Sequence, residues 1–279
     1  MLAPLQRATG KAEVSFKQRD DKTVLADLYQ EGCAKVRLAR AEKGRLAEAV
    51  LINTSGGLTD GDEFTSHVCW EANTTAIVTT QASERLYKTL SGHASIVSDL
   101  KINEGACALW LPQETIMFDG GAYERKTLID MPSNATLVAI ESTMFGRKAM
   151  GEAVTQGWLR EHWQVRIDGK LAFVDAFELG KDIDQKLGRR VIASGAKALS
   201  TIVFAGPDIE TMRDRLNEII ESNEGVGRAS SLGALMVVRL FAKDSQSLRK
   251  LTVPILDELL LHATQAKGEA SLLPRVWSL

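Results

Sequence analysis

The first two thirds of the sequence is a succession of short apolar and β-branched runs separated by Gly, Asn, Asp and Pro. Runs of about four to eight residues with this punctuation are typical of β-strands. No long helical periodicity precedes residue 180, although 151–161 is consistent with a short helix. The chain is therefore expected to be mainly β. The predicted strands are 12–16, 36–39, 48–53, 67–71, 75–80, 106–111, 127–131, 136–141, 163–167 and 171–178.

A weak internal repeat runs through this region. Segments 72–81, 104–113 and 133–142 each begin with a turn residue, continue with small residues and end as an apolar strand. The turn residues Asn73, Gly105 and Asn134 stand 32 and 29 positions apart, and a further strand precedes each unit. Two strands per repeat predict stacked β-layers, either a β-helix or solenoid-like body or a layered, sandwich-like one.

The last third has a different pattern. Strand-like runs at 199–204 and 232–242 alternate with amphipathic segments that predict two helices. Asp208 is the expected N-cap of the first helix, and Asp244 or Ser245 opens the second. We expect one domain over 1–279, with a β-rich body at about 1–198 and a strand–helix–strand–helix lobe at about 199–279.

Composition excludes several classes of protein. The formal net charge is -2 and the sequence pI about 6.2, so the chain lacks the basic field of a nucleic-acid binder. No apolar run approaches the roughly 20 residues of a membrane span, and residues 1–9 lack the apolar core of a signal peptide. Three dispersed cysteines without a CxxC pair predict reduced thiols in a cytoplasmic protein and no structural zinc site.

A glycine-rich acidic turn follows the strand at 48–53. Gly56 and Gly61 have the spacing of a phosphate loop, but Asp62 and Glu63 stand where that loop needs Lys and Ser/Thr. Together with Asp60 these carboxylates would repel a triphosphate. The turn is suited to holding a cation or a partner; the alternative is a surface turn with capping aspartates.

No catalytic pattern emerges elsewhere. There is no GxSxG nucleophile motif. The GxGxxS at 225–230 follows a predicted helix rather than a strand, and we interpret it as a loop instead of a dinucleotide site. These observations favour a protein that is not an enzyme.

A cation that is passed along rather than stored needs few and weak oxygen ligands. Strand alternation places His67 and Cys69 on one face, where with Asp62 and Glu63 they could form a mixed site; the alternative is a core cysteine beside a half-exposed histidine. Carboxylates at strand ends are further candidates: Glu114, Asp119, Glu141, Asp175 and Glu178.

Six segments, in order, resemble the urease accessory protein UreD family, also called UreH. They are LINTSGGLTDGD (51–62), TTQASERLYKT (79–89), WLPQETIMFDGG (110–121), ESTMFGRKAMGE (141–152), VDAFEL (174–179) and LPRVW (273–277). The resemblance covers essentially the whole chain. It departs at Asp60, often Gly in such proteins, and at Asn73 and Asn134, where Gly is typical; Asn tolerates the left-handed turn conformation.

The resemblance implies a β-helical body with a small helical component and a non-enzymatic role. Similar proteins bind apo-urease and, with UreF as direct partner and the GTPase UreG, deliver nickel to its active site, for which water-filled tunnels are proposed. We therefore expect partners similar to UreF and UreG, a dimer within that complex, transient Ni²⁺ and no tightly bound cofactor. We expect neither nucleic acid nor membrane as a partner.

Two sets of residues become candidates under this interpretation. The transient nickel path would include Asp60, Asp62, Glu63, His67, Glu141, Asp175 and Glu178, and the docking element would include Arg275, Val276 and Trp277. The alternative is a stand-alone β-sandwich binding domain or enzyme with an unrecognised site. A maturation scaffold should be poorly soluble without its partner, whereas a free-standing domain should be soluble and monomeric.

Overall fold

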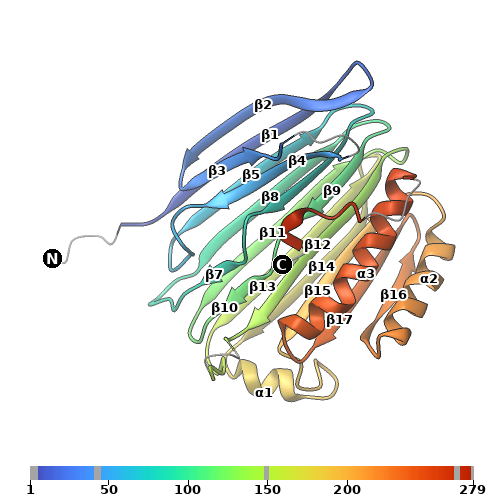
Figure 1. Ribbon diagram of the computed structural model, residues 1–279. Coiled ribbons are helices and arrows are strands. Elements are labelled where there is room, and N and C mark those ends of the chain that lie inside the picture. Colours follow the sequence, from blue (N-terminus) through green and yellow to red (C-terminus); the bar gives the residue numbers. More distant parts are fainter. Residues whose placement is uncertain (1–5, 41–44, 148–150, 267–270, 278–279) are drawn as a thin grey trace.

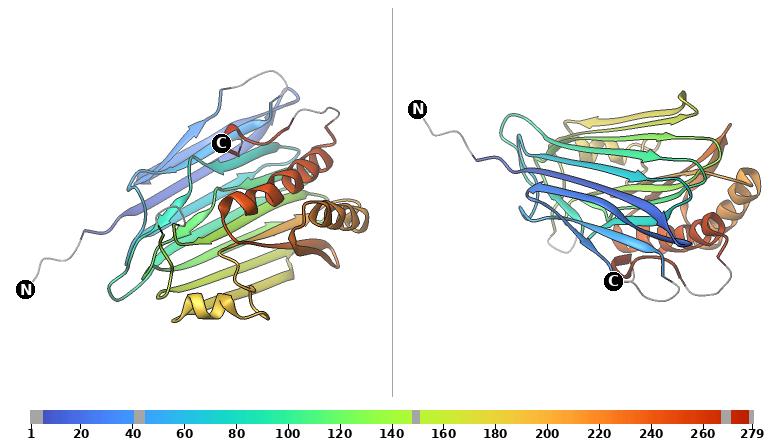
Figure 2. Two further views of the ribbon diagram at one scale, coloured as in Figure 1. Left: turned by 60° about the horizontal axis from the view of Figure 1, so that its bottom comes forward. Right: turned by 90° about the horizontal axis from the view of Figure 1, so that it is seen from above.

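The computed structural model describes residues 6–40, 45–147, 151–266 and 271–277, and these residues form two stacked sheets covered on one side by helices (Figures 1 and 2). The outer sheet has the order β14 (Lys170–Gly180), β13 (Trp158–Ile167), β11 (Ala122–Met131), β8 (Ala94–Ile102), β5 (Glu63–Trp70), β1 (Thr9–Arg19) and β2 (Lys22–Gly32).

The middle sheet lies between the outer sheet and the two longer helices. Its order is β16 (Val226–Leu232), β17 (Leu235–Ala242), β15 (Ala198–Ala205), β12 (Thr136–Phe145), β9 (Cys107–Leu111), β6 (Thr75–Thr80), β4 (Ala47–Asn53) and β3 (Ala34–Leu38), with short strands β7 (Glu84–Leu86) and β10 (Thr115–Met117) beside this path. The helices are α1 (Ile183–Gly188), α2 (Ile209–Ser222) and α3 (Ser245–Thr264), and a 3₁₀ turn spans Arg275–Trp277.

The predicted repeat is confirmed as a stack of coils. In each coil one strand joins the outer sheet and the next joins the middle sheet, as in β5–β6, β8–β9 and β11–β12, and neighbouring coils pair in parallel. The turns stack as well: a Cβ on Gly105 would lie 2.4 Å from the Asn73 side chain, and both residues have positive φ. Asn134 is not among the positive-φ residues of the described chain, so its turn has a different conformation.

Two cores follow from strand alternation. In β12, Leu137, Ala139 and Phe145 point into the core between the sheets, whereas Val138 and Ile140 point toward the helices. The leucines of α3 fill the second core. The described part of 199–279 therefore extends the fold through the middle sheet, because β15 pairs with β12 and β17 pairs with β15. No helix in the described ranges is long and apolar enough to cross a membrane.

Several local predictions were wrong. Segment 151–161 contains no helix; it leads irregularly into β13. The GxGxxS segment is not a loop, because its residues form most of the edge strand β16. Strand β2 and helix α1 were not predicted: β2 is largely exposed and lacks apolar alternation, and α1 has only six residues.

The two expected helix N-caps differ. Asp244 accepts a hydrogen bond from the backbone N–H of Ser247 at 2.8 Å, which confirms it as the N-cap of α3. Asp208 is the N-cap residue of α2, as predicted, but it has the left-handed conformation and makes no side-chain capping bond. The exposed Asp208 carboxylate instead lies 3.9 Å from His262.

Candidate functional site

The middle sheet is interrupted at the same level in neighbouring coils. β6 ends at Thr80 and β7 begins at Glu84; β9 ends at Leu111 and β10 begins at Thr115. Thr115 pairs with Glu84, so the two interruptions lie side by side. Pro112 contributes to the second interruption because it has no N–H for a ladder bond. The resulting gap faces the uninterrupted strand β12.

A cavity of 240 Å³ lies at these interruptions. Exposed residues at its mouth include Gly56, Gln81 and Arg85, and its deep lining includes the buried Trp110 and Glu141. The outer sheet contributes buried hydroxyls from Ser66 and Ser98, which are in register on β5 and β8. A cavity of this size with several polar groups in its lining has room for water.

The Gln113 side chain adds to the polar lining. It is 6% exposed, and its amide nitrogen finds no hydrogen-bond partner among the described residues. Its amide oxygen accepts from Arg249 of α3 at 3.1 Å. The cavity wall is thereby tied to the helix layer behind the middle sheet.

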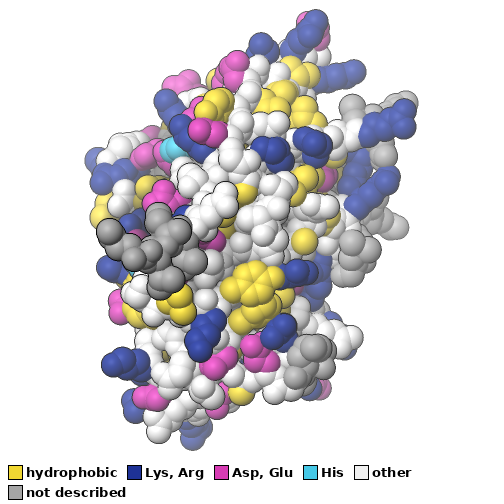
Figure 3. Space-filling model, turned by 90° about the vertical axis from the view of Figure 1, so that its left-hand side faces the viewer, with side chains coloured by type: hydrophobic (Ala, Val, Ile, Leu, Met, Phe, Trp, Pro, Cys, Tyr) yellow, Lys and Arg dark blue, Asp and Glu magenta, His cyan; other side chains and the backbone are white. Residues whose placement is uncertain are grey.

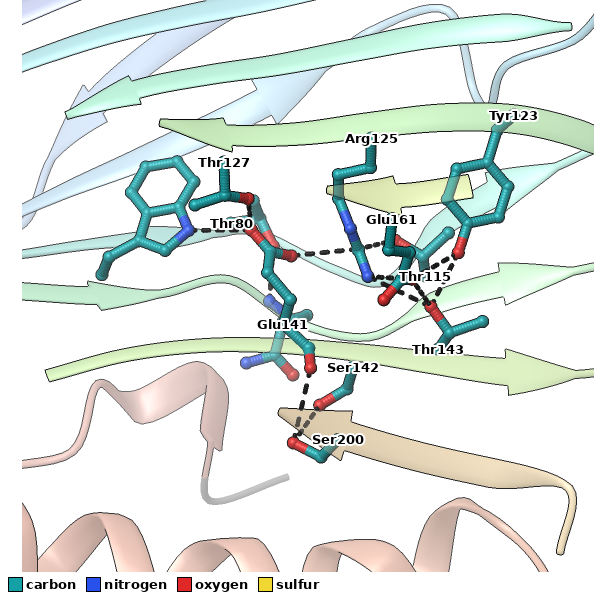
Figure 4. A network of polar contacts seen from close by, with 12 residues as sticks. Thr80, Thr115, Tyr123, Arg125, Thr127, Glu141, Ser142, Thr143, Glu161 and Ser200 are labelled. Carbon is teal, nitrogen blue, oxygen red and sulfur yellow. Dashed lines mark hydrogen bonds and ion pairs between the residues drawn. The ribbon is translucent and has the colours of Figure 1, made fainter. Parts of the chain in front are cut away.

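A network of buried polar side chains, built around Arg125, Glu141 and Glu161, closes the deep end of the cavity (Figure 4). Arg125 lies on β11, and strand register places Glu161 of β13 directly beside it. The Arg125 Nη1 atom lies 3.0 Å from Glu141 Oε2 across the sheets, and Nη2 donates to Glu161 Oε1. All three side chains are almost completely buried.

Neutral donors complete the network. Trp110 Nε1 donates to Glu141 Oε1 at 2.9 Å. Tyr123 and Thr143 donate to Glu161 Oε1 at 2.7 and 2.5 Å. Arg125 also donates to the hydroxyls of Thr115 and Thr143 at 2.9 and 3.1 Å. Each carboxylate therefore has both a cationic and a neutral partner, as buried charges require.

Burial and neighbouring charges both shift the pKa values of these groups, in opposite directions for Glu141 and Arg125. Burial raises the pKa of Glu141 above its ordinary value, although Arg125 partly offsets the shift. Burial lowers the pKa of Arg125, but the charges of Glu141 and Glu161 outweigh this and raise it overall. Burial, together with the charge of Glu161, also raises the pKa of Tyr123 well above its usual value, so its phenol stays neutral.

A second lining carboxylate lies nearer the mouth. Glu84 accepts a hydrogen bond from Asn53 Nδ2 at 3.0 Å. Burial raises the pKa of Glu84, and the Asn53 hydrogen bond partly opposes the shift. Glu114, in the adjacent interruption, accepts from Ser83 and pairs with Arg249 at 3.2 Å. The cavity thus offers carboxylate oxygens at two depths. Glu84 lies nearer the mouth, and Glu141 lies at the deep end.

Of the predicted cation ligands, Glu141 is the one that lines this cavity. Asp62 is buried, and its two oxygens accept from the backbone N–H groups of Ala8 and Thr59 at 2.7 and 2.8 Å. Asp60 accepts from Ser91 and lies 3.6 Å from Arg7. These two aspartates stabilise the turn, as the alternative interpretation expects.

The other predicted ligands lie apart from the cavity. Glu63 is exposed. His67 and Cys69 do share a face, but it is the outer face of the outer sheet, where His67 Nδ1 lies 3.2 Å from Asp99. Asp175 pairs with Arg239 at 2.7 Å, and Glu178 accepts from Trp158 at 3.1 Å. Asp119 accepts from the backbone N–H groups of Thr155 and Gln156.

Within the described ranges, no three His, Cys, Asp or Glu side chains gather in a metal-binding arrangement.

The predicted docking element forms part of the helix-side core. Trp277 is 3% exposed, its Nε1 donates to Leu111 O at 3.1 Å, and the Arg249 guanidinium lies over its ring. The carbonyl of Val276 accepts from Arg249 at 2.8 Å. These contacts hold Val276 and Trp277 against the helix side of the cavity wall. A docking role for Arg275–Trp277 stays a prediction.

Arg125, Glu161 and Glu84 were not predicted as site residues. The signal for the first two is present in the alternation of their strands: Tyr123, Thr127 and Ile129 point inward, as does Arg125 between them. A charged residue on a core face indicates a buried ion pair or a site. Its partner follows only from the register of β11 against β13.

Four of the six family-like segments meet at this site. Segments 79–89 and 110–121 contain the two interruptions, 51–62 contributes further lining residues, and 141–152 begins with Glu141. Residues 148–150 lie outside the described ranges. The family model described as UreD urease accessory protein matches residues 8–278. The chain belongs to the UreD family.

Curated relatives support the UreD assignment. Proteins named urease accessory protein UreD are 39% identical in Brucella suis, 37% in Rhizobium johnstonii and 38% in Chelativorans sp. (strain BNC1). The alignments cover 100%, 98% and 99% of this chain and 97%, 96% and 96% of those proteins. The similarity to UreD proteins therefore spans both the coils and the helix layer.

Proposed function

We propose that this UreD-family chain is a non-catalytic urease maturation factor that binds apo-urease and conveys nickel toward its active site. The observation that carries the proposal is the cavity between the sheets, whose lining includes two carboxylates, Glu84 nearer the mouth and Glu141 at the deep end. The names of the relatives supply the connection to urease. Partners similar to UreF and UreG would complete the delivery complex, in which we expect the chain to dimerise.

The chemistry of the lining suits a cation in transit. Ni²⁺ binds carboxylate and hydroxyl oxygens, although nitrogen and sulfur ligands hold it more strongly. Glu84, Glu141 and the intervening hydroxyls of Ser66 and Ser98 provide weak oxygen ligands along one passage. Because they are few and separated, nickel would be passed along rather than retained.

The outer surface at this end of the coils is mixed in character. Figure 3 shows charged side chains of both signs around this face, with one group of hydrophobic side chains just below its centre and others near its top. Tyr87 and Leu90, just after β7, are 40% and 78% exposed. Such a surface is compatible with a partner, and we propose no specific docking residue on it.

Reconstituted urease activation tests the function. Urease subunits and the other accessory proteins are produced with and without this chain, supplied with Ni²⁺, and assayed for nickel per active site and urea hydrolysis. We expect both to depend on the chain. Equal nickel content without it would refute the maturation role.

Substitutions then test the path. Glu84→Gln is expected to lower nickel loading while the accessory complex still assembles. The pair Asp62→Asn and Glu63→Gln tests the acidic turn; Asp62 is engaged by two backbone N–H groups, so this pair also reports on turn stability. Unchanged nickel content in the Asp62/Glu63 variant would exclude these two residues from the path.

A further inference from the structure

A second cavity lies on the far side of the buried network of Arg125, Glu141 and Glu161. It measures 300 Å³, and its lining includes Glu161, Phe177, Thr201 and Arg239. Val191, which is 92% exposed, marks its outer end. The first cavity ends at Arg125 and Glu141, and the second begins at Glu161, the residue that pairs with Arg125. One buried ion cluster therefore separates two cavities that open in different parts of the molecule.

The guanidinium of Arg125 occupies the space between the two carboxylates. Nη1 faces Glu141 and Thr115, and Nη2 faces Glu161 and Thr143. The cluster has one cation and two carboxylates, hence one uncompensated negative charge when both acids are ionised. The other cation at the second cavity, Arg239, is already paired with Asp175 at 2.7 Å.

We propose that Arg125 determines the cation selectivity of the passage by occupying, in the resting protein, the place where a divalent cation binds between Glu141 and Glu161. This inference rests on the proposed nickel-conveying function. A cation that crosses from one cavity to the other must take the position of the guanidinium, and the displaced Arg125 side chain has room in the first cavity, which it already lines.

The charge balance favours a divalent over a monovalent ion. Na⁺ or K⁺ in place of the guanidinium would leave the same uncompensated charge and would lose a set of charge-assisted hydrogen bonds. A divalent ion neutralises both carboxylates, and the hydroxyls of Thr115 and Thr143 supply further oxygen ligands. Only the divalent ion therefore gains electrostatic energy that can offset displacement of Arg125.

Replacing Arg125 by an uncharged side chain should turn the crossing point into a metal trap. Arg125→Met keeps an unbranched side chain and removes the charge, and the matched control is the triple variant Arg125→Met, Glu141→Gln, Glu161→Gln, whose cluster is neutral. Each full-length chain is produced with the accessory partners, exposed to Ni²⁺ in excess Na⁺, and desalted. Metal analysis is expected to find one more Ni²⁺ ion per chain in Arg125→Met than in the triple variant.

Solubility supplies a second readout, because Arg125→Met leaves two buried carboxylates without a cation. We expect Ni²⁺ in the growth medium, but not additional Na⁺, to raise the soluble yield of Arg125→Met and to leave that of the triple variant unchanged. Nickel retention equal to that of the triple variant would overturn the proposal. So would an Arg125→Met chain that stays insoluble with Ni²⁺ while the triple variant is soluble.

The same samples separate this inference from the proposed function. If the wild-type chain raises the nickel content of urease but Arg125→Met traps no metal, the role of Arg125 is wrong and the maturation function stands. If the wild-type chain leaves urease nickel content unchanged, the maturation function fails, and the inference about Arg125 fails with it.

Discussion

At the scale of single residues, two buried tryptophans make similar hydrogen bonds to different acceptors. Trp110 donates to the Glu141 carboxylate at 2.9 Å, and Trp70 donates to the Ala76 carbonyl at the same distance. We expect Trp110→Phe to lose about 1 kcal/mol more unfolding free energy than Trp70→Phe, because bonds to charged acceptors contribute more. Urea unfolding followed by circular dichroism measures both, and equal losses would argue against an ionised Glu141.

The Glu84 carboxylate should make stability depend on pH. Its pKa is raised above the ordinary value of 4.5, so the folded chain binds more protons than the unfolded chain once the pH exceeds that value. The contribution of Glu84 to the unfolding free energy should therefore fall as the pH rises from 4.5 through the raised pKa, and then level off. Glu84→Gln should remove this contribution, as measured by the difference in urea unfolding between wild type and variant at several pH values. Glu104→Gln, which removes an exposed charge, is the control and should leave the wild-type slope intact.

At the scale of elements, the glycine turn after β4 provides a matched pair. Both Gly56 and Gly57 have positive φ, but a Cβ on Gly57 would lie 2.8 Å from the Arg85 carbonyl, whereas a Cβ on Gly56 meets nothing within 4 Å. Gly56→Ala should cost about 1 kcal/mol, from backbone strain alone. Gly57→Ala should cost more, because β7 must also shift. Thermal unfolding of the two variants compares them, and equal melting temperatures would show that the contact with β7 is flexible.

Also at the scale of elements, the sequence predicts some features of the fold and fails to predict others. Apolar strands and the turn at each coil were predictable because they follow local periodicity, as in 75–80, which matches β6 (Thr75–Thr80). β2 and β16 were missed because their exposed side chains lack that periodicity. The cavity depends on interruptions that align between coils, and Arg125 meets Glu141 only through the stacking of two sheets. These contacts depend on the register between strands that are distant in the sequence, and a local sequence pattern does not determine that register.

At the scale of the whole molecule, the two sheets enclose the first cavity between them. Each strand of the outer sheet has one face toward this interior and one face toward the outside. Ser98 on β8 is 3% exposed and lines the first cavity, whereas Ser95, on the same strand, lies on the opposite face. A larger side chain at Ser98 would therefore fill the passage, and one at Ser95 would point away from it.

We expect Ser98→Leu to lower nickel per urease active site severalfold, while Ser95→Leu supports wild-type loading. Because the cavity measures 240 Å³, it has room for the added carbon atoms, and any packing cost should be of the order of 1–3 kcal/mol. Co-purification of each variant with its accessory partners controls for folding and assembly. If Ser98→Leu assembles normally and loads nickel as well as Ser95→Leu, nickel does not travel between the sheets, and the chain acts on urease through its outer surfaces instead.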